Sequence, residues 1–444
     1  MAVDRSNPHF DRTERAWRQL LLSAAAVYGK IPGMLDMVII GGGVHGTYLS
    51  HVISARLGFR ELAVVDPYRQ PLTVWGRHTQ ACGMRYLRSP SSHNLDLDFH
   101  ALREFAVRRG WDRNTAFIPP YARPLLRLFD EHAAAVIREN GLQRWRHTGT
   151  VRDLILHDDH VTVTTEHQRL RARYALLAVG RSAALCYPRW SAALAAAGDV
   201  VDHVLAPTFC RQRLLHSDSP VIVGAGASGV QLALATAAES GTPVTVISEH
   251  EIRVRSFDSD PCFIGPRCAR HFLAETDYSR RRAMIIAARD PGSVPEEVAL
   301  QLSRFRDQGA VRIITAAVRS VRQTGGRIRL QLANGIDIQS DCVTVATGFA
   351  PGPPGGALVQ QVAERYNLAR SADGFPLPDG FLRWHPRLFV SGALAELELG
   401  PFAPNIIGAI AAAKRVGAFL LQRDAPHRHH WVPLSRLWDS AQSA

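Results

Sequence analysis

The strongest constraint on the fold is a glycine-rich turn that follows an apolar run, and it occurs twice. The stretch Asp36–Gly46 reads DMVIIGGGVHG, and Pro220–Gly229 reads PVIVGAGASG. Each run is apolar at successive positions instead of alternating, which is typical of a buried parallel strand. Such a turn brings bare backbone close to a phosphate and points a helix N-terminus at the negative charge. The sequence therefore predicts two dinucleotide-binding sites in one chain.

The first site contains the three fingerprint glycines Gly41, Gly43 and Gly46. Gly41 permits the tight turn, Gly43 allows a pyrophosphate to approach, and Gly46 allows close packing of the helix on the strand. Asp66 ends the next short strand, ELAVVDP, where its carboxylate can accept hydrogen bonds from both ribose hydroxyls of an adenosine. Because its negative charge would repel a 2′-phosphate, this site is predicted to bind FAD or NAD.

The second site repeats the plan with a different end to its second strand. Its cofactor-binding candidates in the turn are Gly224, Gly226, Ser228 and Gly229. Ser248 takes the place that Asp66 holds in the first repeat. A hydroxyl there, with Arg253 or Arg255 nearby, would accept a 2′-phosphate and therefore NADPH. Glu249, one residue further on, could instead hold a ribose, which leaves NADH as the alternative.

The order of the motifs indicates an internal duplication in an α/β chain. Each βαβ unit is followed by short alternating stretches that predict a β-meander, and the second of these contains the hairpin signal Asn334-Gly335. We expect two Rossmann-like domains, an FAD domain at 34–205 and 338–430 that is interrupted by an NAD(P)H domain at 206–337. An insertion at about 255–300 is expected to form a lid or a substrate wall. Residues 1–33 are expected to be a helical extension, or sequence upstream of a true start at Met34.

Composition argues against several other classes of function. The net charge is +12, but the arginines are dispersed, so we expect no nucleic-acid binding and an attraction for an anionic dinucleotide instead. No run approaches the roughly 18 apolar residues that span a membrane. The six cysteines show no C-x-x-C and no repeated spacing, so neither a structural disulfide nor a metal site is expected, and a reducing cytoplasm fits. The lack of neighbouring thiols also argues against a disulfide reductase.

Two further motifs carry a resemblance to a known family. They are VATGF at 345–349 and the pair SGAL and LGPFAPNIIGA at 391–394 and 399–409. Together with both fingerprints, they make residues 36–422 similar to the two-dinucleotide-binding-domain flavoproteins, and among these to N-hydroxylating flavin monooxygenases of the lysine/ornithine N-hydroxylase type. The sequence departs from many relatives in having Ala393, not an aspartate, after Gly392. The F-x-G-x-x-x-H signature of Baeyer–Villiger enzymes does not occur between the repeats.

The resemblance implies where FAD and substrate would lie. The first fingerprint and Asp66 would hold the adenosine half, and Gly348 would mark the crossing back to the FAD domain. Arg88 is the candidate for gripping a substrate carboxylate, since a guanidinium fork matches that geometry. The candidates beside the isoalloxazine are Trp75, Met84 and Leu87. Those at the last strand and around the pyrimidine end, where a helix N-terminus stabilises negative charge, are Gly392, Gly400, Pro401, Asn405 and Ile406.

The resemblance also implies a reaction. NADPH would reduce FAD, O₂ would add at the flavin C4a, and the resulting (hydro)peroxide would transfer one oxygen to a small-molecule substrate, by preference an amine or amino-acid nitrogen. Such chemistry needs a dry pocket and a neutral amine more than acid–base side chains. His45, His93 and His271 are accordingly interpreted as structural or exposed. Two alternatives stay open: an NAD(P)H-dependent flavin oxidoreductase or dehydrogenase without oxygen insertion, and a catalytically silent nucleotide-binding regulatory protein.

Overall fold

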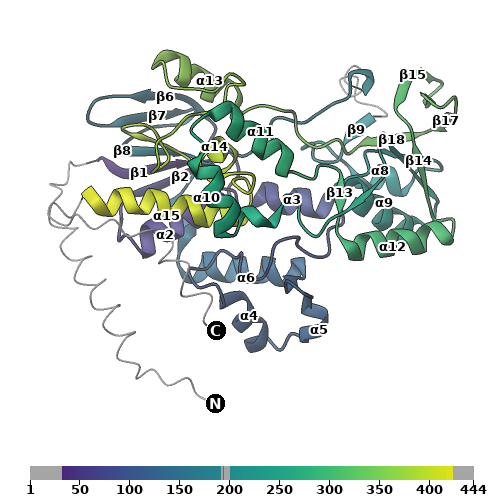
Figure 1. Ribbon diagram of the computed structural model, residues 1–444, viewed down its shortest axis with the longest axis horizontal. Coiled ribbons are helices and arrows are strands. Elements are labelled where there is room, and N and C mark those ends of the chain that lie inside the picture. The colour runs from purple at the N-terminus through teal and green to yellow at the C-terminus, as the bar shows by residue number, and fades with distance from the viewer. Residues whose placement is uncertain (1–32, 192–193, 195–200, 424–444) are drawn as a thin grey trace.

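The computed structural model describes residues 33–191, 194 and 201–423, and two β-sheets with parallel central strands lie at opposite ends of the molecule (Figure 1). Separate clusters of buried hydrophobic side chains surround the two sheets. The expectation of an α/β chain with two Rossmann-like domains is confirmed.

The first sheet is built around β1 (Leu35–Ile40). β1 pairs in parallel with β2 (Leu62–Asp66) on one side and with β8 (Arg169–Leu177) on the other. The last four residues of β1 are buried, as a strand covered on both faces requires. The remaining strands of the central path are β5 (Arg146–Thr148) beyond β2, β20 (Leu388–Val390) beyond β8, and the antiparallel edge strand β19 (Arg383–His385).

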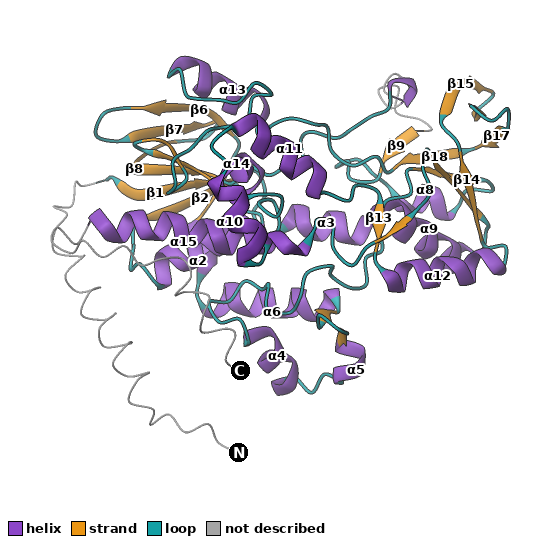
Figure 2. Ribbon diagram, in the orientation of Figure 1, coloured by secondary structure: helices purple, strands orange, loops and turns teal. Residues whose placement is uncertain are grey.

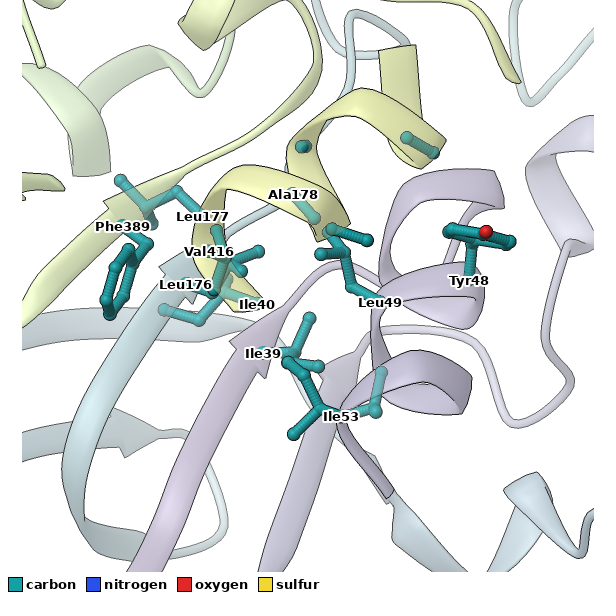
Figure 3. Close-up of a cluster of buried hydrophobic side chains, with 14 of the residues drawn as sticks. Ile39, Ile40, Tyr48, Leu49, Ile53, Leu176, Leu177, Ala178, Phe389 and Val416 are labelled. Carbon is teal, nitrogen blue, oxygen red and sulfur yellow. The ribbon is translucent and has the colours of Figure 1, made fainter. Parts of the chain in front are cut away.

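Helices α2 (Val44–Ala55) and α15 (Ile406–Arg423) pack against each other beside this sheet (Figure 1). Figure 3 shows Leu49 and Ile53 of α2 beside Ile39 of β1, and all three are almost completely buried. Each such side chain contributes roughly 1.5–3 kcal/mol when it leaves water. The predicted first meander is present as β6 (Val151–Leu156) and β7 (Val161–Thr165), which continue antiparallel from β8, with α13 (Gly356–Arg365) packed on β6.

A helical segment separates β2 from β5 in the chain. Figure 2 shows α4, α5 and α6 grouped below the sheets, whereas α3 runs between the two ends of the molecule. The elements of this segment are α3 (Thr73–Ala81), α4 (Ala101–Arg108), α5 (Arg113–Ala116), β3 (Phe117–Ile118), β4 (Arg123–Pro124), α6 (Leu126–Glu139) and η1 (Leu142–Trp145).

The second sheet is parallel throughout, and its strand order is β14-β11-β10-β18-β9. Helices α9 (Ala227–Ser240) and α12 (Glu296–Asp307) pack on each other and on its strands. Its strands are β9 (Val201–His203), β10 (Pro220–Val223), β11 (Val244–Ser248), β14 (Val311–Thr315) and β18 (Cys342–Val345), with the short helix α8 (Arg211–Leu215) beside β18.

The second domain is longer than the sequence predicted. β9 and β18 both belong to its sheet, so that sheet extends from residue 201 to residue 345, and the predicted boundaries at 206 and 337 are wrong. The second meander is confirmed as β15 (Val318–Thr324), β16 (Arg327–Leu332) and β17 (Asp337–Ser340). Its hairpin turns at Asn334-Gly335, where Gly335 has a φ of 84°.

The insertion folds as a small helical unit. Phe272 and Ile285 are buried against Phe375 and Leu397, so the unit docks on the first domain. Its elements are β12 (Arg253–Val254), η2 (Pro261–Phe263), α10 (Pro266–Ala274), α11 (Tyr278–Ala288) and β13 (Ser293–Val294).

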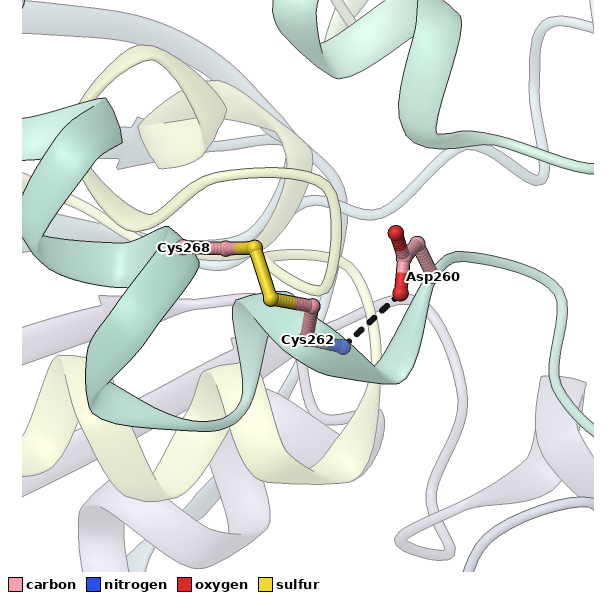
Figure 4. The surroundings of a disulfide bond; sticks show 3 residues. All are labelled: Asp260, Cys262 and Cys268. Carbon is pink, nitrogen blue, oxygen red and sulfur yellow. Dashed lines mark hydrogen bonds between the residues drawn. A yellow bond between two sulfur atoms is a disulfide. The ribbon is translucent and has the colours of Figure 1, made fainter.

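Cys262 and Cys268 form a disulfide that joins η2 to α10 (Figure 4). The expectation of no structural disulfide is wrong, and the argument for a reducing compartment loses this support. The spacing of six residues is no recognisable motif, because the pair meets only when the chain reverses at Gly265. Among the described residues, Cys82, Cys186, Cys210 and Cys342 are free.

Two further sequence expectations concern the N-terminal extension and membrane-spanning helices. The extension expected at residues 1–33 lies, apart from Gly33, outside the described residues. Within the described part of the chain, no helix combines the length and the apolar character needed to cross a bilayer.

Several buried histidines make stability depend on pH. Burial lowers the pKa of His93 to about 4, and the pKa values of His45 and His203 likewise. The unfolded chain therefore binds more protons than the folded chain between pH 6.5 and 4, so stability falls as the pH drops through that window.

We predict that His93→Gln flattens this dependence. When the pH is lowered from 7 to 5, the free energy of unfolding of this variant should decrease by about 2 kcal/mol less than that of the wild type. The reason is that the variant lacks one group whose pKa is lower in the folded chain than in the unfolded chain. Denaturant unfolding at both pH values measures it. The variant of the exposed His100, His100→Gln, is the control and should behave as the wild type does; equal slopes for all three proteins would contradict the prediction.

Candidate dinucleotide-binding sites

The first fingerprint folds into a cradle at the end of β1. Gly41 has a φ of 108°, and a Cβ on it would overlap the carbonyl oxygen of Ala178 in the loop after β8. A Cβ on Gly46 would overlap the carbonyl oxygen of Gly41. By contrast, a Cβ on Gly43 would meet nothing within 4 Å, so the turn is open on the side where a pyrophosphate would approach. The three glycines occupy the positions that the sequence predicts.

Asp66 lies at the end of β2, directly beside this turn. Its Oδ2 accepts a hydrogen bond from Gly42 N at 2.6 Å, and its Oδ1 accepts one from Tyr68 N at 2.9 Å. These bonds fix the carboxylate at the edge of the cradle.

The second fingerprint has the same steric design. Gly224 has a φ of 113°, and a Cβ on it would lie 2.6 Å from the carbonyl oxygen of Ala346. A Cβ on Gly229 would overlap the carbonyl oxygen of Gly224, and one on Gly226 would lie 3.4 Å from the Cα of Gly292 in the insertion. Ser228 lies in the first turn of α9, whose first turn contains no acidic residue.

Both cradles fit a dinucleotide. Each places a helix N-terminus behind a turn in which two glycines have no room for a side chain, and neither α2 nor α9 has an acidic residue in its first turn to oppose a phosphate.

The candidates for nucleotide selection lie at the end of β11. Ser248 donates from its hydroxyl to the carbonyl of His250 at 2.6 Å. Arg253 is half-exposed on β12, where it donates to the carbonyl of Pro291 at 2.5 Å and lies 4.0 Å from Asp290. A hydroxyl and an arginine thus stand near the second cradle.

The segment expected beside the flavin is split between a cavity and the core. Trp75 lines a cavity of about 660 Å³ and donates to Asp130 at 3.1 Å. Met84 packs partly buried against the core, and Leu87 is buried within it. The end of α3 approaches the other domain so closely that a Cβ on Gly83 would lie 2.6 Å from the Cβ of Ala235.

The C-terminal candidates form one loop that leads into α15. Gly400 has a φ of 79°, and a Cβ on it would lie 3.8 Å from the rings of both Phe263 and Phe272. The insertion therefore covers this loop, in which Pro401 is buried. Asn405 precedes Ile406, the first residue of α15, and its Nδ2 donates to Asp258 of the insertion at 3.1 Å.

Gly348 lies where the chain leaves the second sheet. It follows β18, its carbonyl accepts from Cys186 N at 2.9 Å, and the neighbouring Phe349 forms a bridge with Leu185 on the outgoing chain. The outgoing and returning segments therefore lie side by side at Gly348.

His45 connects the first cradle to the C-terminal loop, which sequence reasoning missed. Its Nε2 lies 3.1 Å from the carbonyl of Asn405 and its Nδ1 lies 2.8 Å from the hydroxyl of Ser391. Since a carbonyl only accepts, Nε2 donates, and in the neutral ring Nδ1 then accepts from the Ser391 hydroxyl. Burial holds the pKa of His45 at about 4. A Cβ on Gly392 would lie 3.8 Å from this ring.

Arg88 is not free to grip a substrate. Its guanidinium donates to the carbonyls of Arg255, Ser256, Phe257 and Ser293, of which the bond to Phe257 is 2.5 Å long. The side chain therefore fastens the insertion to the segment beyond α3, and the substrate-carboxylate interpretation is corrected to a positioning one.

A buried charge cluster lies behind the C-terminal loop and was not foreseen. Glu396 of α14 (Glu396–Leu399) is 0 % exposed and pairs with Arg289 at 2.5 Å, with Arg181 at 3.5 Å and with Arg282. The signal in the sequence was a pair of acids in an apolar stretch, LAELEL. Breaking such a buried pair typically costs about 3–5 kcal/mol, so the cluster fixes α11 against the loop.

Comparisons with solved structures place this geometry among known folds. The chain is similar to an FAD-bound cadaverine monooxygenase of Erwinia amylovora, with 14% identity over 90% of this chain and 96% of that chain and a TM-score of 0.68. It is similar to a Kutzneria ornithine N-hydroxylase, with 15% identity over 88% and 100% and a TM-score of 0.67. The L-lysine 6-monooxygenase of Pseudomonas syringae gives 16% identity over 88% and 100%, with a TM-score of 0.67.

At these identities the likeness establishes the fold. A search of curated protein sequences finds no match. The family of pyridine nucleotide-disulphide oxidoreductases matches residues 35–417, which is most of the chain. The protein therefore belongs to the pyridine nucleotide-disulphide oxidoreductase family, with the two-domain fold that N-hydroxylating flavin monooxygenases share.

Proposed function

We propose that the protein is an FAD-dependent, NADPH-oxidising monooxygenase that N-hydroxylates a small-molecule amine. The observation that carries this proposal is the pair of cradles in one chain, with a covering insertion docked over the loop that follows Gly400. The similar solved structures support it, since their names describe oxygenases of cadaverine, ornithine and lysine. Small molecule and O₂ are the partners; the cytoplasmic location stays a prediction from the sequence.

The first cradle and Asp66 would hold the adenosine half of FAD. The loop from Gly400 to Asn405, in front of the N-terminus of α15, would face the flavin ring. When bound, FAD supplies the redox chemistry that activates O₂ and oxygenates the substrate.

The second cradle would hold NADPH. Ser248 presents a hydroxyl where the first repeat presents a carboxylate, and Arg253 offers a guanidinium within the same region. Such a pair favours a 2′-phosphate over a free hydroxyl. Glu249, which is exposed one residue further on, keeps NADH as the alternative donor.

The insertion would exclude water from the reacting centre. Phe263 and Phe272 lie over Gly400, and Phe272 continues into the buried cluster with Ile285, Phe375 and Leu397. A water-poor site protects reactive oxygen species from hydrolytic loss and favours the neutral amine. No acid–base side chain has to take part in this scheme.

Asp258 is the group we assign to the substrate ammonium. Its carboxylate is exposed, faces the loop through Asn405, and follows Phe257, whose carbonyl Arg88 holds. Arg88 would thus position a carboxylate that binds a cationic amine before the amine loses its proton.

The decisive test of the proposal is product formation from amines. Anaerobic NADPH should reduce the bound flavin, and reoxidation under ¹⁸O₂ with a panel of diamines and amino acids should yield a hydroxylamine that carries one labelled oxygen. Mass spectrometry measures it. Flavin reduction without label in any product would favour an oxidoreductase without oxygen insertion, and no reduction at all would favour a silent regulatory protein.

We predict that Asp258→Asn separates substrate binding from flavin reduction. The KM for the amine should rise at least about tenfold, because a hydrogen bond to a charged group contributes about 1.5–3 kcal/mol, while the KM for NADPH stays within about twofold. Steady-state kinetics of amine-dependent product formation measures both.

Asp260→Asn is the matched control, since this neighbouring carboxylate accepts from Cys262 N and makes no bond to Asn405. An unchanged amine KM in Asp258→Asn, or an equal rise in the control, would remove Asp258 from the substrate site.

The disulfide favours a second candidate, a disulfide reductase. In that reaction NADPH and one proton would deliver two electrons through the flavin, the bond between Cys262 and Cys268 would break, and two thiols would form. We predict instead that Cys262→Ser/Cys268→Ser retains amine-dependent NADPH oxidation within about threefold. Loss of NADPH oxidation in the variant, together with two new thiols per wild-type chain after anaerobic NADPH, would establish the reductase.

A further inference from the structure

Arg146 lies beside the first cradle and has no role in the scheme above. It begins β5, the strand next to β2, and its backbone is in register with Val64. The side chain reaches back along the sheet to the fingerprint, where a Cβ on Gly42 would overlap its Nη1. The guanidinium therefore rests directly on the turn that follows β1.

The donors of this guanidinium are only partly used. Nη2 donates to the carbonyl of Tyr68 at 2.6 Å and to that of Gln70 at 3.3 Å, and it lies 3.3 Å from Asp66 Oδ1. Nε and Nη1 are buried without any hydrogen-bond partner. Leaving a charged donor buried and unpaired costs more than the roughly 1–3 kcal/mol of a neutral group, so these two donors have a reason to gain an acceptor.

Asp66, the carboxylate that neutralises Arg146, is shared with other donors. Arg146 is 6 % exposed, and burial lowers its pKa against the opposing effect of Asp66, yet a guanidinium stays protonated in proteins. Asp66 already accepts from Gly42 N and Tyr68 N, so one carboxylate serves three donors. The N-terminus of α2 adds positive potential on the same side.

We propose that Arg146 binds the diphosphate of FAD through Nε and Nη1, as a clamp that closes on the turn from β5. The proposal rests on FAD occupying the first cradle. It extends the fingerprint by one residue that lies about a hundred positions further along the chain and that no glycine pattern reveals. A planar guanidinium suits a phosphate because two parallel N–H bonds match two oxygens.

The competing interpretation is a structural tether. Through Nη2 alone, Arg146 holds the carbonyls of Tyr68 and Gln70 and so shapes the loop after Asp66. A tether would support every adenine nucleotide and nucleoside alike, whereas a diphosphate clamp distinguishes ligands by their phosphates.

The test is a comparison of ADP with adenosine on the full-length chain stripped of flavin. In Arg146→Gln, the Kd for ADP should rise at least about tenfold, and that for adenosine by less than about threefold. The Kd for FAD should rise with that for ADP. Titration calorimetry measures all three without any catalytic turnover. Arg144→Gln is the matched control, since it removes the same charge two residues earlier in the chain, where Arg144 stacks on Trp145, and should leave all three constants unchanged.

An equal loss for ADP and adenosine in Arg146→Gln would establish the tether and overturn the proposal. Arg146→Lys keeps the charge but loses the two parallel N–H donors of the guanidinium. Its Kd for ADP should lie between those of the wild type and Arg146→Gln, and its Kd for adenosine should stay at the wild-type value. If neither variant binds adenosine, Arg146 is needed for the fold and the proposal is wrong. A wild-type chain that binds no FAD would instead refute the proposed function, so the two failures are distinguishable.

Discussion

The approach of one backbone to another at the two strand–turn–helix junctions is the constraint on which the molecule depends. A side chain on Gly46 would overlap the carbonyl of Gly41, and one on Gly229 that of Gly224. This contact lets each helix begin directly behind its turn, with its free N–H groups facing the open side. The strands must then be buried on both faces and the helices must pack on them. The two sheets and their cores follow from that requirement.

The relative position of the two cradles depends on arginines whose side chains bind groups of the other domain. Arg123 of β4 forms a two-pronged pair with Glu297 of α12, with bonds of 3.0 and 2.5 Å, and the arginine is 5 % exposed. Arg88 holds the carbonyls of Arg255 and Phe257, which precede Asp258 in the chain. These contacts join α12 and the insertion to the first domain.

The fold could be predicted from local sequence patterns, whereas the residues that meet at the site are brought together by long-range contacts. The apolar runs, the glycine spacing and the turn at Asn334-Gly335 each act within a few residues, so the sequence alone identified both domains. The domain boundaries were misplaced because β9 and β18 join the second sheet through pairing between residues about 140 apart. For the same reason the contacts of His45, the position of Arg146 and the disulfide were not predicted. Each acquires its meaning from a partner that the chain brings near only after folding.

The basic composition also gains a physical explanation from these contacts. Lys30 and Lys414 are the only lysines among 52 basic residues. Several arginines are at least partly buried and paired with acceptors: Arg88 on carbonyls, Arg123 on a carboxylate, and three others around Glu396. A buried lysine readily loses its proton and offers donors from a single atom, whereas a guanidinium stays charged and divides five donors among several acceptors. A chain that joins its domains through polar backbone thus requires arginine at these positions, and its positive charge is in part a consequence of its architecture.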